Sequence, residues 1–299
     1  MNDVDRCIHA LSRIIRGKNE EIRLAVCCLL ARGHLLIEDL PGMGKTTLAH
    51  GLAKVMGLDY NRVQFTSDLL PADIIGVALF DRESSRFRFK KGPLFSQLVL
   101  ADEINRASPR TQSALLEAME ERQVSIEGTS RPLPEPFFVI ATQNPGSQEG
   151  TFLLPESQLD RFLMRIHLGY PDHESEKAIL KGDAGRSEMD RLEQIIAPGD
   201  LVKLQKQVSG IHAGDMLLEY VLRLVNASRE AGYFRAGLSP RAGLSLLEAA
   251  KAWAFINGRD YVIPEDVQAV FLPVAAHRLQ EKEHGASARE LLASVDVMV

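Results

Sequence analysis

The fold of this chain is decided by one glycine-rich stretch, Leu40-Pro41-Gly42-Met43-Gly44-Lys45-Thr46-Thr47. A short apolar run at 34–37 precedes it, and residues 46–56 follow with apolar side chains at helical spacing. A glycine-rich turn between a buried strand and a helix is the setting in which a P-loop binds the phosphates of a nucleotide. The stretch therefore predicts a nucleotide-binding α/β fold.

The residues of this stretch suit ATP and Mg²⁺. Glycines let backbone N–H groups turn towards the phosphates, and the N-terminus of the following helix adds a partial positive charge. Lys45 can reach the β- and γ-phosphates, and the Thr46 hydroxyl can bind Mg²⁺. Asp39 stands where the pattern has its first glycine, which predicts a slightly different entry into the loop. The predicted cofactor-binding residues are Pro41, Gly42, Met43, Gly44, Lys45, Thr46 and Thr47.

A second motif places two acids directly after a strand. The apolar run 98–101 ends in Asp102 and Glu103. Acids at the carboxyl end of a parallel strand lie where ligands bind in such sheets. We expect Asp102 to hold Mg²⁺ through water, and Glu103 to orient and polarise the attacking water. A polar exit from the strand is the alternative, but the P-loop favours the catalytic interpretation.

The other apolar runs predict the rest of a mostly parallel sheet, because helical segments lie between several of them. Two stretches, 77–90 and 123–134, alternate around turns and predict hairpins. We expect core strands at 34–37, 62–65, 98–101, 137–141 and 163–168. After residue 171 the pattern is helical throughout, near 173–182, 198–208, 214–231, 239–256 and 264–279. These patterns predict an α/β domain at 1–171 and an all-helical domain at 172–299.

Two further polar residues are candidates for the site. Asn144 follows the run 137–141, where its amide could fix the attacking water and sense the γ-phosphate. It could equally close an Asx-turn before Pro145. Arg161 lies in a loop, where an arginine is usually a solvated cation. The residues alone leave Asn144 open and favour the solvated interpretation for Arg161.

Several longer motifs together resemble the MoxR family of AAA+ ATPases. They cover nearly the whole chain in the family's order, which is far more specific than a lone P-loop. The motifs are Asp68-Leu69-Leu70-Pro71-Ala72-Asp73-Ile74, Gly92-Pro93-Leu94-Phe95, Ala101-Asp102-Glu103-Ile104-Asn105-Arg106-Ala107, Gln112-Ser113-Ala114-Leu115-Leu116-Glu117-Ala118-Met119-Glu120-Glu121, Ala141-Thr142-Gln143-Asn144-Pro145, Leu154-Pro155-Glu156-Ser157-Gln158-Leu159-Asp160-Arg161-Phe162 and Leu238-Ser239-Pro240-Arg241-Ala242.

The resemblance implies an AAA+ P-loop module followed by an all-α helical lid. It implies that Asn144 is the sensor 1 residue and that Arg161 is an arginine finger acting on a neighbour's nucleotide. It also implies that Arg241 is the sensor 2 residue, on the lid and reaching the γ-phosphate. The expected catalytic residues are then Glu103, Asn144, Arg161 and Arg241, and the expected Mg²⁺ ligands are Thr46 and Asp102.

The resemblance also implies partners. Members of the family form hexameric rings, hydrolyse ATP to ADP and phosphate, and help to mature or activate other protein complexes in a chaperone-like way. A protein with a von Willebrand factor A domain is often involved. We therefore expect self-assembly, a client protein and an adaptor on a separate chain, because this chain ends near Val299 with no appended domain. The two predicted hairpins resemble the family's inserts before the Walker B strand and before sensor 1.

The overall charge bears on rival functions. The formal net charge is −5, with no long block of Lys or Arg, which argues against dedicated nucleic-acid binding. A nucleic-acid-directed AAA+ motor and a chelatase-type motor subunit remain alternatives. A small-molecule P-loop kinase is a third, but it would need neither an intersubunit Arg161 nor a lid with Arg241.

The location and the remaining residues have simpler interpretations. The acidic N-terminus predicts no signal peptide, and the longest apolar runs are too short to span a bilayer, so we expect a cytoplasmic protein without membrane insertion. Trp253 is expected in the helical core. The cysteines Cys7, Cys27 and Cys28 are expected as buried reduced thiols. A group of charged residues is expected on a helix face that is either solvated or at a contact between subunits: Glu117, Glu120, Glu121 and Arg122. The basic hairpin 77–91 is either a solvated edge protected by charge or a client contact.

Overall fold

The computed structural model describes residues 2–82, 85–126, 128–145, 150–180, 186–230, 234–280 and 287–297. Its centre is a parallel five-stranded sheet in the order β2-β5-β8-β1-β9. All five predicted strands are confirmed, with ends that differ from the prediction by no more than two residues. Their bounds are Leu35–Glu38 for β1, Tyr60–Gln64 for β2, Leu98–Asp102 for β5, Phe138–Gln143 for β8 and Met164–Ile166 for β9.

The sheet separates two apolar layers because successive strand residues point to opposite faces. On one face, Leu35 and Ile37 of β1 pack with α1, α2 and α3; on the other, Leu36 packs with α5. The three central strands are apolar along almost their whole length, as expected for strands covered on both sides. The helices of these layers are α1 (Asp3–Ile14), α2 (Asn19–Leu30), α3 (Lys45–Val55), α4 (Pro71–Ile75) and α5 (Pro109–Glu121).

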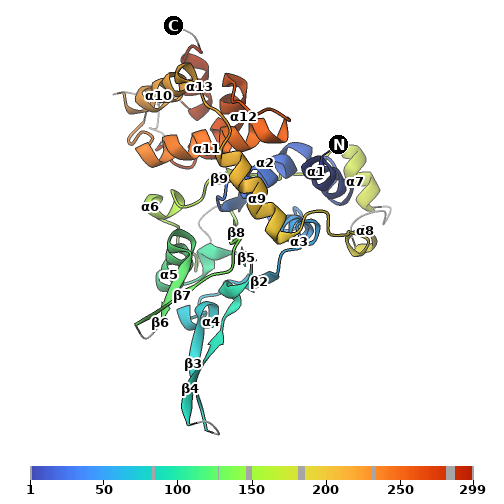
Figure 1. The fold of residues 1–299 in the computed structure, drawn as a ribbon, viewed down its shortest axis with the longest axis vertical. Coiled ribbons are helices and arrows are strands. Elements are labelled where there is room, and N and C mark those ends of the chain that lie inside the picture. The colour runs from blue at the N-terminus through green and yellow to red at the C-terminus, as the bar shows by residue number, and fades with distance from the viewer. Residues whose placement is uncertain are drawn as a thin grey trace.

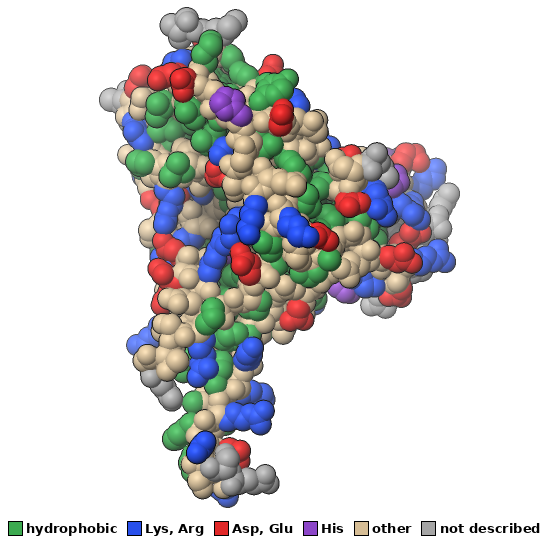
Figure 2. All heavy atoms as spheres, in the orientation of Figure 1, with side chains coloured by type: hydrophobic (Ala, Val, Ile, Leu, Met, Phe, Trp, Pro, Cys, Tyr) green, Lys and Arg blue, Asp and Glu red, His purple; other side chains and the backbone are tan. Residues whose placement is uncertain are grey.

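Two hairpins leave the α/β body, as the alternating patterns predict. The first, β3 (Gly76–Asp81) with β4 (Arg86–Lys91), projects furthest from the body in Figure 1, and β6 (Gln123–Ile126) with β7 (Thr129–Pro132) projects beside it. Figure 2 shows lysine and arginine side chains along the first hairpin. Its aromatic tip pair, Phe80 and Phe87, is exposed. The structure leaves both interpretations of this basic hairpin open.

Helices gather at the opposite end from the hairpins (Figure 1). Trp253 is buried among them, as predicted, and the three cysteines are buried free thiols. Their apolar core is continuous with the α1–α3 side of the sheet. The division at residue 171 stays a prediction. Bounds are α6 (Glu156–Leu159), α7 (His173–Leu180), α8 (Arg186–Asp190), α9 (Pro198–Ser209), α10 (Asp215–Arg229), α11 (Pro240–Ile256), α12 (Pro264–Ala275) and α13 (Ala288–Ser294), with single 3₁₀ turns at Pro93–Phe95 and Ile104–Arg106.

Local sequence signals explain where the lid helices begin. Ser239 is the N-cap of α11 and accepts a hydrogen bond from the backbone of Ala242, with Pro240 in the first turn. Asp266 accepts one from the backbone N–H of Ile263 at the start of α12. The first cap places Arg241 in the first turn of α11. In the described part of the chain, no helix combines the length and apolar character needed to cross a membrane.

Candidate nucleotide site

The P-loop takes the open shape that phosphates require. Gly42 and Gly44 have φ of 87° and 90°, in the left-handed region that favours glycine. A Cβ added at either position would meet no atom within 4 Å, so the space over the loop is free for a ligand. Pro41 and Gly42 are exposed, and the loop is half-buried at Met43, Gly44, Thr46 and Thr47. This cradle fits the phosphates of a nucleotide.

Lys45 is the buried cation of the loop. Its Nζ donates to the carbonyl oxygens of Asp39 and Leu40, the latter at 3.2 Å, and to Asn144 Oδ1 at 3.3 Å. Burial lowers the pKa of Lys45, and the nearby charges of Asp39, Asp102 and Glu103 oppose that shift. The amine is therefore held by neutral oxygens beside a group of acids, where a phosphate would provide a stronger partner.

Asp102 lies at the carboxyl end of β5 and is 8% exposed. Its Oδ1 accepts a hydrogen bond from Thr142 Oγ1 at 2.6 Å, and its Oδ2 pairs with Arg62 Nη2 at 2.7 Å. A carboxylate has about four lone-pair sites, so both oxygens can still accept from water. Hydroxyl and carboxylate oxygens are the donors that Mg²⁺ prefers, so Thr46 and Asp102 fit this ion.

Glu103 is held in an unusual backbone conformation. Its φ is 55°, which costs a residue with a side chain about 1–2 kcal/mol. Such strain clusters at functional sites. Its carboxylate accepts from Asn144 Nδ2 at 3.2 Å, Gln64 Nε2 at 3.0 Å and Arg106 Nη1 at 2.9 Å. The amide of Asn144 therefore lies between Lys45 and Glu103 and joins the two halves of the site.

The sheet topology explains why these side chains meet. Strand β8 lies between β5 and β1, and all three run parallel. Their carboxyl ends therefore lie side by side. Strand β5 leads to Glu103, β8 leads to Asn144, and β1 leads to the P-loop. Ligands bind outside this edge in open α/β sheets. The structure thus brings together the P-loop, both acids and Asn144.

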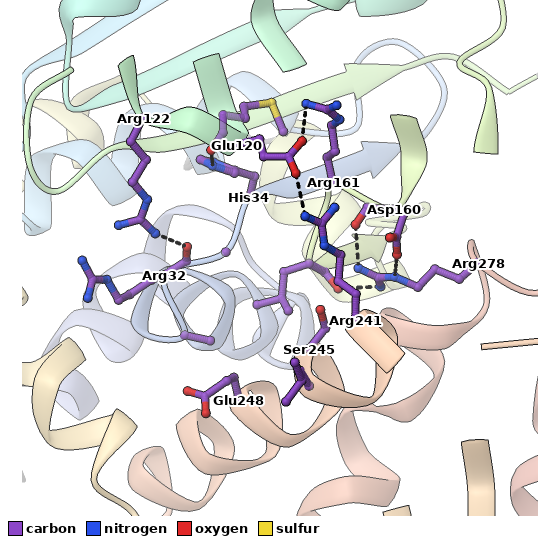
Figure 3. A pocket seen from close by; sticks show the side chains of 15 residues that line it. Arg32, His34, Glu120, Arg122, Asp160, Arg161, Arg241, Ser245, Glu248 and Arg278 are labelled. Atoms are coloured by element: carbon purple, nitrogen blue, oxygen red, sulfur yellow. Dashed lines mark hydrogen bonds and ion pairs between the residues drawn. The ribbon is translucent and has the colours of Figure 1, made fainter. Parts of the chain in front are cut away.

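The two arginines of the predicted site lie elsewhere. Arg161 Nη1 and Arg241 Nη2 each pair with one oxygen of Glu120, both at 2.6 Å (Figure 3). The three residues line a pocket of about 350 Å³. The same pocket is lined by Gly33 and His34, which directly precede β1. Arg161 and Arg241 are therefore beside the amino end of β1, whereas the P-loop follows its carboxyl end.

The arginine cluster is tied to the sheet and to the lid. His34 faces Met119 O through Nε2 at 3.2 Å and accepts from the backbone of Val139, and burial lowers its pKa to about 4. The neutral ring therefore joins β1, α5 and β8. Arg278, which follows α12, pairs with Asp160 at 2.6 Å, so the loop that carries Arg161 is fixed to the lid.

Several contacts of these networks were not predicted from sequence, among them those of Arg62, Gln64 and Glu120. Arg62 and Gln64 lie on β2, outside the recognised motifs, and only the pairing of β2 with β5 brings them to the acids. Glu120 is exposed, as the sequence predicts, but its ion pairs with two guanidinium groups were not predicted. Its place in the motif 112–121 was the available signal.

Asp39 has a structural role at the entry to the loop. Its Oδ2 accepts from the backbone N–H groups of Leu168 and Gly169, the latter at 2.8 Å, and its Oδ1 from Leu40 N at 3.2 Å. Its φ is not positive, so a side chain is accommodated where the usual pattern has glycine. The carboxylate thus fixes the P-loop to the segment that leads from β9 towards the lid.

Comparisons with known proteins agree with this architecture. Residues 34–164 match the model of the ATPase family associated with various cellular activities (AAA), and residues 226–295 match an AAA lid domain. The uncharacterized protein YeaC of Bacillus subtilis is 42% identical, over 98% of this chain and 94% of its own length. A crystal structure from Cytophaga hutchinsonii superposes with a TM-score of 0.90 at 39% identity, covering 98% of this chain and 93% of the other.

A further relative carries the family's name. Chaperone MoxR1 of Mycobacterium tuberculosis is 41% identical over 93% of this chain and 76% of its own length. That similarity runs through both the α/β region and the lid. The chain belongs to the MoxR family of AAA+ ATPases.

Proposed function

We propose that this chain is a Mg²⁺-dependent ATP hydrolase whose active sites form between neighbouring subunits of a ring. The separation of Lys45 from Arg161 carries the proposal. Strand β1, Leu35–Glu38, lies between the two positions, and a strand of that length spans about 13 Å. An arginine finger must touch the phosphates it stabilises. Arg161 therefore serves the nucleotide of another subunit.

Each subunit supplies two different surfaces to such a site. One surface is the P-loop edge, where Lys45 would bind the phosphates, Thr46 and Asp102 would hold Mg²⁺, and Glu103 would take the proton of the attacking water. Asn144 would orient that water beside Glu103. The bound Mg²⁺ would neutralise charge on the phosphates. The other surface presents Arg161 and Arg241 to the neighbour.

The assembly is a closed ring that remodels other proteins. A head-to-tail contact joins two different surfaces, and it closes only as a ring. The family resemblance supports a hexamer, a client protein and an adaptor with a von Willebrand factor A domain. The relative named as a chaperone supports the chaperone-like role. The acidic net charge of −5 supports a protein client over nucleic acid.

Mixing two inactive variants tests the shared site. Lys45→Ala removes the phosphate-binding amine, and Arg161→Ala removes the finger. In an equal mixture, about a quarter of head-to-tail contacts join an intact P-loop to an intact Arg161. A finger contributes several orders of magnitude to turnover, so the mixture should hydrolyse ATP well above either parent. The subunits are mixed before ATP is added, so that rings form from both.

Ring formation by each variant is measured separately by light scattering. If mixed rings form and turnover stays at the background of the parents, Arg161 does not act across the interface, and the shared site is wrong. Subunits that remain monomers with saturating ATP would contradict the ring itself.

A further inference from the structure

The carboxylate of Glu120 touches both arginines of the shared site. It lies near the end of α5, while Arg161 follows α6 and Arg241 opens the lid helix α11. Both contacts are 2.6 Å long, and each uses a different oxygen. Two cations from separate parts of the chain are thus held together by a single anion (Figure 3).

The two arginines would repel each other without that anion. Two like charges brought within a few ångströms oppose each other in a partly buried site. The side chains of Glu120 and Arg161 are 30% and 29% exposed and that of Arg241 is 56% exposed, so water screens the three charges only in part. Contact with Arg241, then the charge of Arg161, lowers the pKa of Glu120 and keeps it ionised. The carboxylate offsets the repulsion and sets the spacing of the two guanidinium groups.

The contacts with Glu120 use only some of the guanidinium nitrogens, and the others could donate to a phosphate. Arg161 donates from Nη1 to Glu120 and to the carbonyl of Leu116 at 2.7 Å. A guanidinium has five N–H donors in a fixed fork, and those on Nε and Nη2 belong to the same rigid plane. Fixing one nitrogen of the fork therefore aims the others. Arg241 is held in the same way through Nη2.

We infer that Glu120 is a positioning residue, which holds Arg161 and Arg241 together as one two-arginine receptor for the terminal phosphate of the neighbouring subunit's ATP. The inference rests on the proposed intersubunit site and adds a residue to it. Glu120 itself touches no nucleotide. It acts by fixing the distance between two groups that come from the α/β body and from the lid.

The test uses Glu120→Gln, which keeps the size of the side chain and removes its charge. One amide oxygen cannot replace a carboxylate that pairs with two cations. Turnover at saturating ATP should fall by roughly tenfold to a hundredfold, as expected for misplaced catalytic groups. The ATP concentration for half-maximal turnover should stay near the wild-type value, because the P-loop of the same subunit is intact. Glu121→Gln, the same change at the next exposed residue, is the matched control and should leave turnover unchanged.

Complementation then shows on which side of the interface Glu120 acts. Glu120→Gln mixed with Lys45→Ala should recover turnover, because the Lys45→Ala subunit brings an intact receptor. Glu120→Gln mixed with Arg161→Ala should not, because both defects lie in the receptor. Where Glu120→Gln does not form rings, Glu120→Asp, which keeps the charge on a shorter side chain, replaces it in the same mixtures.

The results separate this inference from the proposed function. Recovery between Glu120→Gln and Arg161→Ala, or wild-type turnover by Glu120→Gln, would overturn the role of Glu120 and leave the shared site intact. Increased turnover would also overturn it, because the carboxylate would then mask the arginines instead of positioning them. Failure of the Lys45→Ala and Arg161→Ala mixture would instead remove the intersubunit site on which the inference rests.

Discussion

Lys45 and Arg161 lie at opposite ends of strand β1. Lys45 donates to the carbonyl oxygens of Asp39 and Leu40, just after the strand, and Arg161 shares a pocket with Gly33 and His34, just before it. The sheet therefore separates phosphate binding from the arginine groups within one subunit. In the proposed function, catalysis by both groups requires a second copy, so ATP turnover would be coupled to assembly.

Lys45→Ala should weaken ATP binding strongly. The amine is buried beside three acids, and the phosphate oxygens of ATP are the anionic partner that the ligand brings to it. A hydrogen bond to a charged group contributes about 1.5–3 kcal/mol, which corresponds to roughly 10- to 100-fold in the dissociation constant. Calorimetry with ATP and Mg²⁺ measures the change. Lys54→Ala, on the same helix, is the control, and equal affinities for the two variants would remove Lys45 from the site.

Glu103→Gln should bind ATP normally and lose hydrolysis. The amide keeps the size of the side chain but cannot take a proton from water, and general-base catalysis contributes about 10²- to 10⁴-fold. ATP should therefore stay bound and hold the subunits together. Light scattering should report a ring-sized particle with saturating ATP at micromolar protein. Wild-type turnover by this variant would show that another group activates the water.

The sequence predicts the sheet well because its signals are local. The stretch 98–101 is continuously apolar, and a short run of this kind that ends in polar residues is typical of a strand buried on both faces. The P-loop residues are likewise contiguous, so their site can be read from one stretch. The role of Asn144 could be predicted only from the family's motif, because an Asx-turn before Pro145 gives the same local pattern.

The remaining contacts join residues that are far apart in the sequence, so no local sequence pattern predicts them. Glu120 meets Arg241 across 121 positions of the chain, and a helix with several acids in its last turns ordinarily faces solvent. Asp39 meets Gly169 across 130 positions, so local reasoning explained only its tolerance of a turn. Arg241 on α11 and Gly169 after β9 reach these positions only when the chain has folded around the sheet. The ion pairs of Glu120 and the backbone contacts of Asp39 therefore indicate roles for these residues that their residue types alone do not.

Asp39→Ala should lower stability more than ATP affinity. The carboxylate accepts from the backbone of Leu168 and Gly169, and an unpaired buried N–H costs about 1–3 kcal/mol. Asp39→Asn, which keeps one acceptor oxygen, should lose less. Urea unfolding measures the free energy, and calorimetry measures ATP binding. A large loss of affinity at unchanged stability would mean that Asp39 serves the nucleotide directly.

Arg241 should fall in the same complementation group as Arg161. The family resemblance alone leaves open whose γ-phosphate Arg241 reaches, but the contact of both arginines with Glu120 places them in one cluster. Arg241→Ala mixed with Lys45→Ala should therefore recover ATP turnover, because one subunit supplies the P-loop and the other supplies both arginines. Arg241→Ala mixed with Arg161→Ala should stay inactive.

An Arg241 that served its own subunit would reverse both results. The Arg161→Ala subunit would then supply an intact P-loop with Arg241, its Arg241→Ala neighbour would supply Arg161, and that mixture would recover. The mixture with Lys45→Ala would stay inactive, because neither subunit would contain both Lys45 and Arg241. The two mixtures therefore give opposite patterns for the two arrangements. Recovery between the two arginine variants, in rings whose mixed composition is verified, would show that the lid closes over the nucleotide of its own chain.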